Sequence, residues 1–274
     1  MRAALLIAAT GAVAVLGACA ATGRAEPPAA SHQDGAARAA SFLASGYLPR
    51  GSAPDSLLIN PPPPAAGSPA EARDLAAAEA AVALQGTVRF EQAAIDAELF
   101  SPNTVGIFSC AAGFVISPET TPRIAALMRK SAPDLALSVY PTKRKYLRPR
   151  PFMVNGKPTC TPKDEAMLRQ DGSYPSGHAA IGVGWGLILA SVVPDRAGQL
   201  AARGRAFADS RRVCNVHWLS DTEEGGVVAA AAVARLHAEP AFRADLEAAR
   251  AEVETLRATL PKPDCTKEQA ALGS

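Results

Sequence analysis

Aromatic residues are scarce in this sequence, and neither sign of charge dominates it. Phe, Trp and Tyr make up 5% of the 274 residues, which disfavours a β-sheet core. The 28 Lys and Arg residues against 26 Asp and Glu residues leave a formal net charge of +2, which gives no basic field over the whole chain and argues against a general nucleic-acid-binding protein. The chain also lacks a Cys-x-x-Cys pair and any cluster of Cys and His, which argues against a structural zinc site.

Alanine is abundant instead, and it favours helices. Apolar residues recur at helical spacing, prolines stand where helices would begin, and no segment shows a convincing alternation of apolar and polar residues. We therefore predict an all-α fold, a helical bundle. The helices are expected at residues 70–99 (as one or two helices), 122–130, 162–170, 176–193, 194–212, 221–236 and 240–260.

Residues 176–193 are the most apolar of these segments and the candidate for a central helix. Gly182, Gly184 and Gly186 would weaken an isolated helix but permit close packing against neighbours. The segment lacks the length and the polar flanks of a membrane span, so we interpret it as a core helix.

The first twenty residues are typical of a secretory signal peptide. Arg2 gives a short positive start, an apolar run covers residues 3–17, and small residues follow. Two processing routes stay open. Either the chain is cleaved at a site such as Ala18-Cys19-Ala20, or the signal ends at residue 18 and Cys19 becomes a lipid-bearing first residue that anchors the protein to a membrane.

Loss or lipidation of Cys19 leaves four cysteines, an even number that suits two disulfides in an exported chain. Cys110, Cys160, Cys214 and Cys265 can pair in three ways, and the sequence does not choose among them. The expected organisation is a signal peptide over residues 1–20, an extended Pro/Ala-rich N-terminal segment over 21–69, a helical domain over 70–260 and a C-terminal tail over 261–274.

Three polar segments interrupt the apolar background. The first, residues 143–151, carries five cations within eight residues and would alone be interpreted as a solvated loop. The second, Pro175-Ser176-Gly177-His178, precedes the central helix, where a hydroxyl and free N–H groups favour an anion; its ordinary interpretation is a Ser N-cap with a surface His. The third, residues 210–221, places Asp221 four residues after His217, where its carboxylate could orient the imidazole or merely cap a helix.

In order, the three segments read Lys-x6-Arg-Pro, Pro-Ser-Gly-His and Ser-Arg-x5-His-x3-Asp, a combination that chance does not readily produce. This pattern resembles the superfamily of type-2 phosphatidic acid phosphatases and vanadium haloperoxidases, and within it the bacterial class A non-specific acid phosphatases. The likeness covers about Tyr47 to Leu256, with Leu219 standing where Gln is expected.

The resemblance implies that His217 is a nucleophile that forms a phosphohistidine, that Asp221 orients it, and that His178 is the general acid. Spacing to His217 selects Arg211 over Arg212. The resemblance implies that the phosphoryl oxygens are held by Lys143, Arg150, Ser176, Gly177 and Arg211.

Such an enzyme would be a periplasmic acid phosphatase that needs no metal or other cofactor. Its implied partners are small phosphomonoesters, including nucleotides, sugar phosphates and aryl phosphates, and similar enzymes are often homodimers. His32 and His237 match no motif and are expected at the surface. Two other functions remain as alternatives: a vanadate-dependent haloperoxidase and a non-catalytic phosphate-binding protein.

Overall fold

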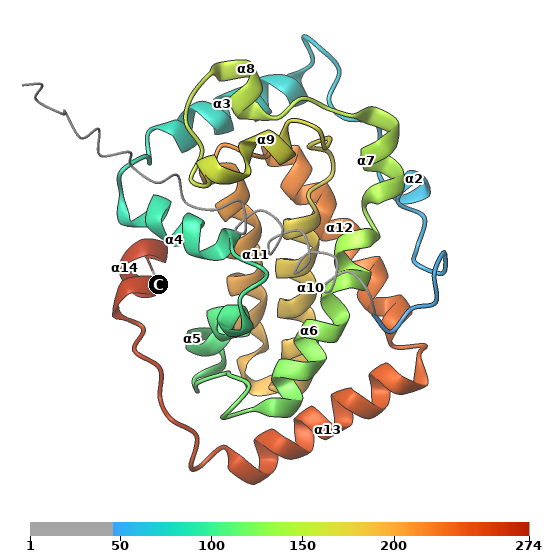
Figure 1. The fold of residues 1–274 in the computed structure, drawn as a ribbon, viewed down its shortest axis with the longest axis vertical. Coiled ribbons are helices and arrows are strands. Elements are labelled where there is room, and N and C mark those ends of the chain that lie inside the picture. The colour runs from blue at the N-terminus through green and yellow to red at the C-terminus, as the bar shows by residue number, and fades with distance from the viewer. Residues whose placement is uncertain (1–45, 274) are drawn as a thin grey trace, which may run out of the picture.

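A computed structural model describes residues 46–273 of the chain (Figure 1). The predicted signal peptide, Cys19, His32 and residues 21–45 of the predicted N-terminal segment lie outside the described residues. Residues 46–273 form helices joined by turns and loops, with no strand among them, so the predicted all-α class is confirmed. No helix within this range has both the length and the apolar character needed to span a bilayer.

Helix α10 (Gly177–Val192) runs through the middle of the bundle (Figure 1). Three long helices pack around it: α6 (Pro122–Leu137), α11 (Ala197–Val213) and α12 (Leu219–Leu236). Helix α13 (Pro240–Leu256) crosses one end and contacts α6 and α10. Because α10 is surrounded, most of its side chains are buried, which explains why the segment is apolar on all sides.

Glycines let α10 and α11 approach until their backbones touch. A Cβ placed on Gly186 would lie 2.8 Å from the carbonyl oxygen of Leu200. A Cβ placed on Gly204 would lie 2.7 Å from the carbonyl oxygen of Gly182. Real Cβ atoms are not found so close to a backbone oxygen. The glycines in the apolar segment therefore serve close packing, as the sequence predicted.

Shorter elements surround this core. Ser68 caps α3 (Pro69–Val82) and Thr87 caps α4 (Val88–Ala97) through their side-chain oxygens, and Pro69 occupies the first turn of α3. The remaining elements are α2 (Ser56–Ile59), α3 (Pro69–Val82), α4 (Val88–Ala97), η1 (Pro102–Phe108), α5 (Ser109–Ala112), α7 (Tyr140–Tyr146), α8 (Pro151–Asn155), η2 (Pro162–Asp164), α9 (Glu165–Leu168), η3 (Pro194–Arg196) and α14 (Thr266–Leu272).

Several predicted boundaries were wrong. Helix α6 continues to Leu137 rather than ending near residue 130, because burial of the turn around Pro133 holds the helix together beyond the missing N–H. Residues 143–146, whose ordinary interpretation was a solvated loop, belong to α7 (Tyr140–Tyr146). Within the segment expected to be extended, Asp55 caps α2, accepting the N–H of Leu57 at 2.9 Å.

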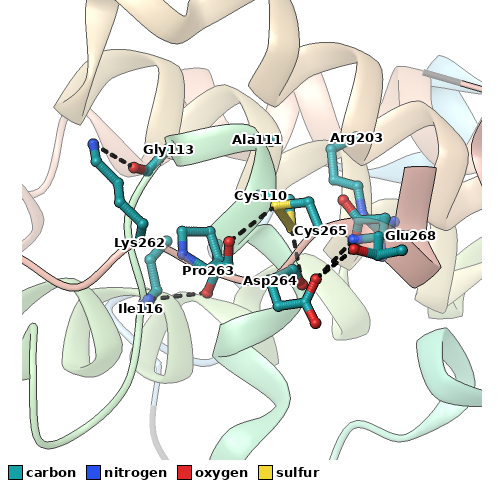
Figure 2. Close-up of a disulfide and its surroundings, with 12 residues drawn as sticks. Cys110, Ala111, Gly113, Ile116, Arg203, Lys262, Pro263, Asp264, Cys265 and Glu268 are labelled. Atoms are coloured by element: carbon teal, nitrogen blue, oxygen red, sulfur yellow. Dashed lines mark hydrogen bonds and ion pairs between the residues drawn. A yellow bond between two sulfur atoms is a disulfide. The ribbon is translucent and has the colours of Figure 1, made fainter.

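The structure pairs Cys160 with Cys214 and Cys110 with Cys265, so it selects one of the three connectivities. The Cys110–Cys265 bond ties the start of α14 to α5 (Figure 2). Beside it, Arg203 of α11 donates from Nε to the Glu268 carboxylate at 3.0 Å. The C-terminal segment is therefore fixed to the bundle by a covalent bond and an ion pair.

Candidate active site

The residues of the three polar segments meet at the end of the bundle where α10 and α12 begin. In Figure 1 this end is covered by α7, α8 and α9. The backbone N–H of Ser176 donates to the carbonyl oxygen of Asp221 at 2.9 Å, which joins the two helix starts. Segments far apart in the sequence thus supply one site.

His217 and Asp221 form a buried pair. Nδ1 of His217 lies 3.2 Å from Oδ2 of Asp221, and the same oxygen accepts the backbone N–H of Trp218 at 2.8 Å. His217 is 3% exposed and Asp221 is fully buried. Because the carboxylate accepts, Nδ1 carries the proton and Nε2 keeps its lone pair.

Arg148 binds the other carboxylate oxygen of Asp221. Arg148 donates from Nη1 to Oδ1 of Asp221 at 2.8 Å and from Nη2 to Oδ2 of Asp74 at 2.7 Å. Asp74, on α3, also accepts the backbone N–H and the hydroxyl of Ser220 at 2.8 and 2.6 Å. Burial raises the pKa of Asp221, and the charge of Arg148 opposes that shift. The network holds the carboxylate that orients His217.

Lys143 and Arg150 lie beside Nε2 of His217. Arg150 donates from Nη1 to the Val216 carbonyl oxygen at 2.9 Å and lies 3.0 Å from Nε2 of His217. Lys143 donates to the carbonyl oxygen of Gly172 at 2.5 Å. Both cations are buried, and Asp171 forms ion pairs with both at 3.4 and 3.3 Å.

Ser176 is the N-cap of α10, and its hydroxyl accepts the N–H of Ala179 at 3.2 Å. Gly177 follows as the first helical residue, so its N–H is one of the donors that a helix start leaves without an intrahelical partner. His178, in the same turn, is half-buried, and its Nε2 lies 3.1 Å from the carbonyl oxygen of Ala97 at the end of α4. This contact orients the His178 ring from outside the three polar segments.

Arg211 is a buried cation with few partners. Its Nη1 lies 4.0 Å from Sγ of Cys214, and its Nε has no hydrogen-bond partner among the described residues. Burial and the nearby charge of Arg150 lower the pKa of Arg211 to about 9. An anion bound beside Arg211 would raise this pKa again, because its negative charge stabilises the buried guanidinium.

A tight turn places Arg211 and His217 together. The N–H groups of Val216 and His217 both donate to the carbonyl oxygen of Arg211 at 3.2 Å. Asn215 takes a left-handed conformation with φ of 61°, which asparagine tolerates, and its side chain donates to the Lys157 carbonyl oxygen at 2.9 Å. The Cys160–Cys214 disulfide attaches the turn to the neighbouring loop. The spacing of five residues between Arg211 and His217 is therefore the length of this turn.

Burial, reinforced by the excess of positive charge, lowers the pKa of each imidazole and of the Lys143 amine in the site. Burial and the charge of Arg150 lower the pKa of Lys143 to about 8. Burial and the charges of Arg150, Lys143 and Arg211 lower the pKa of His217 well below its ordinary value. Burial and the charge of Arg211 lower the pKa of His178 in the same way. Both imidazoles are thus neutral in the empty site near neutral pH.

No group of His, Cys, Asp and Glu residues suited to a metal ion occurs within residues 46–273. The donors that converge on the site are instead Lys, Arg, hydroxyl and backbone N–H groups, a set that suits an anion.

Comparison with known proteins agrees with this chemistry. A family model described as the PAP2 superfamily matches residues 133–242. An acid phosphatase of Zymomonas mobilis subsp. mobilis is 38% identical over 220 residues, covering 79% of this chain and 83% of the relative. Non-specific acid phosphatases of Providencia stuartii and Salmonella typhimurium are each 39% identical, over 77% and 76% of this chain and 86% and 83% of theirs.

The chain belongs to the PAP2 superfamily, with the bacterial class A-type acid phosphatases. As a member of this family it is a phosphatase.

The sequence pattern missed several residues that the structure places in contact with the predicted site residues of this PAP2 phosphatase. Asp74 lies in an alanine-rich helix where an acidic residue is ordinarily solvated, so nothing local distinguished it. The sequence showed Arg148 only as one of five neighbouring cations and did not indicate that it binds Asp221. Asp171 was interpreted only as part of a turn. His237, expected at the surface, is half-buried and packs against Phe242 at the far end of α12.

Proposed function

We propose that this protein hydrolyses a broad range of phosphomonoesters through a phosphohistidine on His217, without a metal ion. The observation that carries the proposal is the environment of His217. Nδ1 is held by Asp221 while Nε2 faces Arg150, amid the charges of Lys143 and Arg211. A neutral, oriented imidazole beside three cations suits attack on a phosphoryl group, whose negative charge those cations would neutralise.

In the first step, Nε2 of His217 attacks phosphorus and the bond to the ester oxygen breaks. The leaving alkoxide takes the proton of His178, so an alcohol departs and the phosphoryl group stays on His217. Asp221 stabilises the positive charge that develops on the His217 ring, and Arg148 and Asp74 keep Asp221 in place.

In the second step, water attacks phosphorus and gives its proton to the now neutral His178. The bond from phosphorus to Nε2 breaks, inorganic phosphate leaves, and both histidines return to their initial states. Through both steps Lys143, Arg150, Arg211, Ser176 and the Gly177 N–H would hold the phosphoryl oxygens.

The substrate range and the location are part of the same proposal. The residues assigned to binding would all contact the phosphoryl group, so nucleotides, sugar phosphates and aryl phosphates would all be accepted. We propose export to the periplasm, on the strength of residues 1–20, with Cys19 either removed or lipidated. We also propose a homodimer, by analogy with similar enzymes.

The test is release of p-nitrophenol from p-nitrophenyl phosphate across pH with excess chelator throughout. We expect turnover on the acid side that the chelator does not reduce. His217→Ala should abolish turnover, and rapid acid-free quenching with labelled substrate should trap label on the wild-type protein alone.

Near-normal hydrolysis by His217→Ala would exclude the covalent mechanism. Turnover that the chelator abolishes would show that the assigned residues are wrong. Phosphate binding without turnover would favour a phosphate-binding protein, and halide oxidation with peroxide and vanadate, well above that of other phosphatases, would favour a haloperoxidase.

A further inference from the structure

We propose that Asp171 is a displaceable counter-ion that competes with substrate for the phosphate-binding cations. The inference rests on the proposed function, because it takes Lys143 and Arg150 to bind the phosphoryl group. It assigns to Asp171 control over how tightly the site binds phosphate.

One oxygen of Asp171 serves both cations. Its Oδ2 lies 3.4 Å from Nζ of Lys143 and 3.3 Å from Nη2 of Arg150. The two cationic side chains are 4% and 2% exposed, and Asp171 is the carboxylate that pairs with them within residues 46–273. In the empty site this oxygen therefore occupies the donors that a phosphoryl oxygen would need.

Asp171 is not fixed as the structural carboxylates are. Asp221 is fully buried and accepts from Trp218, from Arg148 and from Nδ1 of His217. The Asp171 side chain is 37% exposed, and its ion pairs are those with Lys143 and Arg150. It can turn into solvent without becoming a buried unpaired charge, provided that another anion takes its place on the cations.

The phosphate-binding site thus has two unlike halves. Arg211 is buried, with Nε unpartnered and no ion pair among the described residues, so it is open to an incoming anion. Lys143 and Arg150 form the other half, which Asp171 covers. A phosphate dianion brings more charge than a carboxylate and contacts both halves at once, so it can displace Asp171.

A competing role and a positioning role for Asp171 predict opposite effects of its removal on phosphate affinity. If the Asp171 charge competes with phosphate, its removal strengthens phosphate binding. If Asp171 instead holds Lys143 and Arg150 in place, its removal weakens binding.

The experiment measures inorganic phosphate binding to purified wild type and Asp171→Asn by isothermal titration, with the KM and kcat for p-nitrophenyl phosphate measured alongside. Asn keeps the shape of the side chain and removes its charge. We expect phosphate to bind about tenfold more tightly to Asp171→Asn, with a parallel fall in KM and the effect in KM rather than kcat.

Asp164→Asn is the matched control. It removes the same charge from a nearby carboxylate that acts on Arg211 at a distance and makes no ion pair with Lys143 or Arg150. Unchanged or weaker phosphate binding by Asp171→Asn would overturn the proposal, as would equal tightening by Asp164→Asn. A failure of the proposed function is distinguishable, because wild type would then bind phosphate without turning over ester while the titrations still report on Asp171.

Discussion

The pKa of His178 shows how neighbouring charges control the protonation of a single side chain in this site. Burial, together with the charge of nearby Arg211, lowers the pKa of the His178 imidazole in the empty site. A bound phosphate group brings the opposite charge and raises that pKa again. We therefore expect His178 to gain a proton when substrate binds, which is when the proposed mechanism needs a general acid.

Replacing His178 should have an effect that depends on the leaving group. We expect His178→Ala to lower kcat by about 100-fold or more for an alkyl phosphate, whose alkoxide needs a proton, and by about tenfold or less for p-nitrophenyl phosphate. Steady-state kinetics with the two substrates measure the difference. His237→Ala, at the other end of α12, is the control and should behave as wild type. Equal losses for both substrates would remove the general-acid role.

At the scale of helices, the position of the site depends on how α10 packs against its neighbours. Helix α10 carries Ser176 and His178 at its start, and α11 carries Arg211 in its last turn. The two helices touch through Gly182, Gly186 and Gly204, so their separation is fixed by backbone contact rather than by adjustable side chains. A rigid contact of this kind keeps the donors at the helix ends in register.

Two helical glycines provide a matched test of this packing. A Cβ on Gly186 would lie 2.8 Å from the Leu200 carbonyl oxygen, whereas one on Gly198, in the first turn of α11, meets nothing within 4 Å. Gly186→Ala should lower the free energy of unfolding by about 1–3 kcal/mol, because the backbone of α11 would have to move. Gly198→Ala should raise it by up to about 1 kcal/mol through helix propensity. Urea denaturation measures both, and a stabilised Gly186→Ala would contradict the packing described above.

Over the whole molecule, the buried site couples stability to pH. His178 and His217 have lowered pKa values in the folded state, whereas in the unfolded chain each titrates near about 6.5. As pH falls below that value the unfolded state binds protons that the folded state does not. The free energy of unfolding therefore falls with falling pH, and the contribution of the two histidines is fully present only above about 6.5.

We expect the melting temperature to drop between about pH 6.5 and pH 5.5, with each histidine contributing up to about 1.4 kcal/mol per pH unit. Saturating inorganic phosphate should reduce the drop, because the anion favours the protonated imidazoles. The double variant His178→Asn/His217→Asn should show a flatter dependence in differential scanning calorimetry. If the melting temperature of the double variant falls as steeply with pH as that of wild type, groups other than the two histidines cause the dependence.

The sequence alone determined the class of fold and the central helix. Abundant alanine, helical spacing and the scarcity of strand-forming residues are local properties, and they suffice for an all-α bundle. The apolar run with its glycines predicted α10 within a residue at each end, since a helix buried on all sides needs an apolar segment without polar interruption. The spacing of Arg211, His217 and Asp221 could also be recognised in the sequence, because the three residues are close together along the chain. The turn that follows α11 joins Arg211 to His217, and Asp221 lies in the first turn of α12.

The tertiary structure decided which partners these residues find. Asp74, 147 residues before Asp221, is linked to it through Arg148, and Asp171 pairs with Lys143 and Arg150 from a separate loop. The disulfide pairing was undecidable for the same reason, since Cys110 and Cys265 are 155 residues apart. Local patterns report on propensity and burial, whereas these contacts depend on where the helices place distant charges, and that is set by packing of the whole chain.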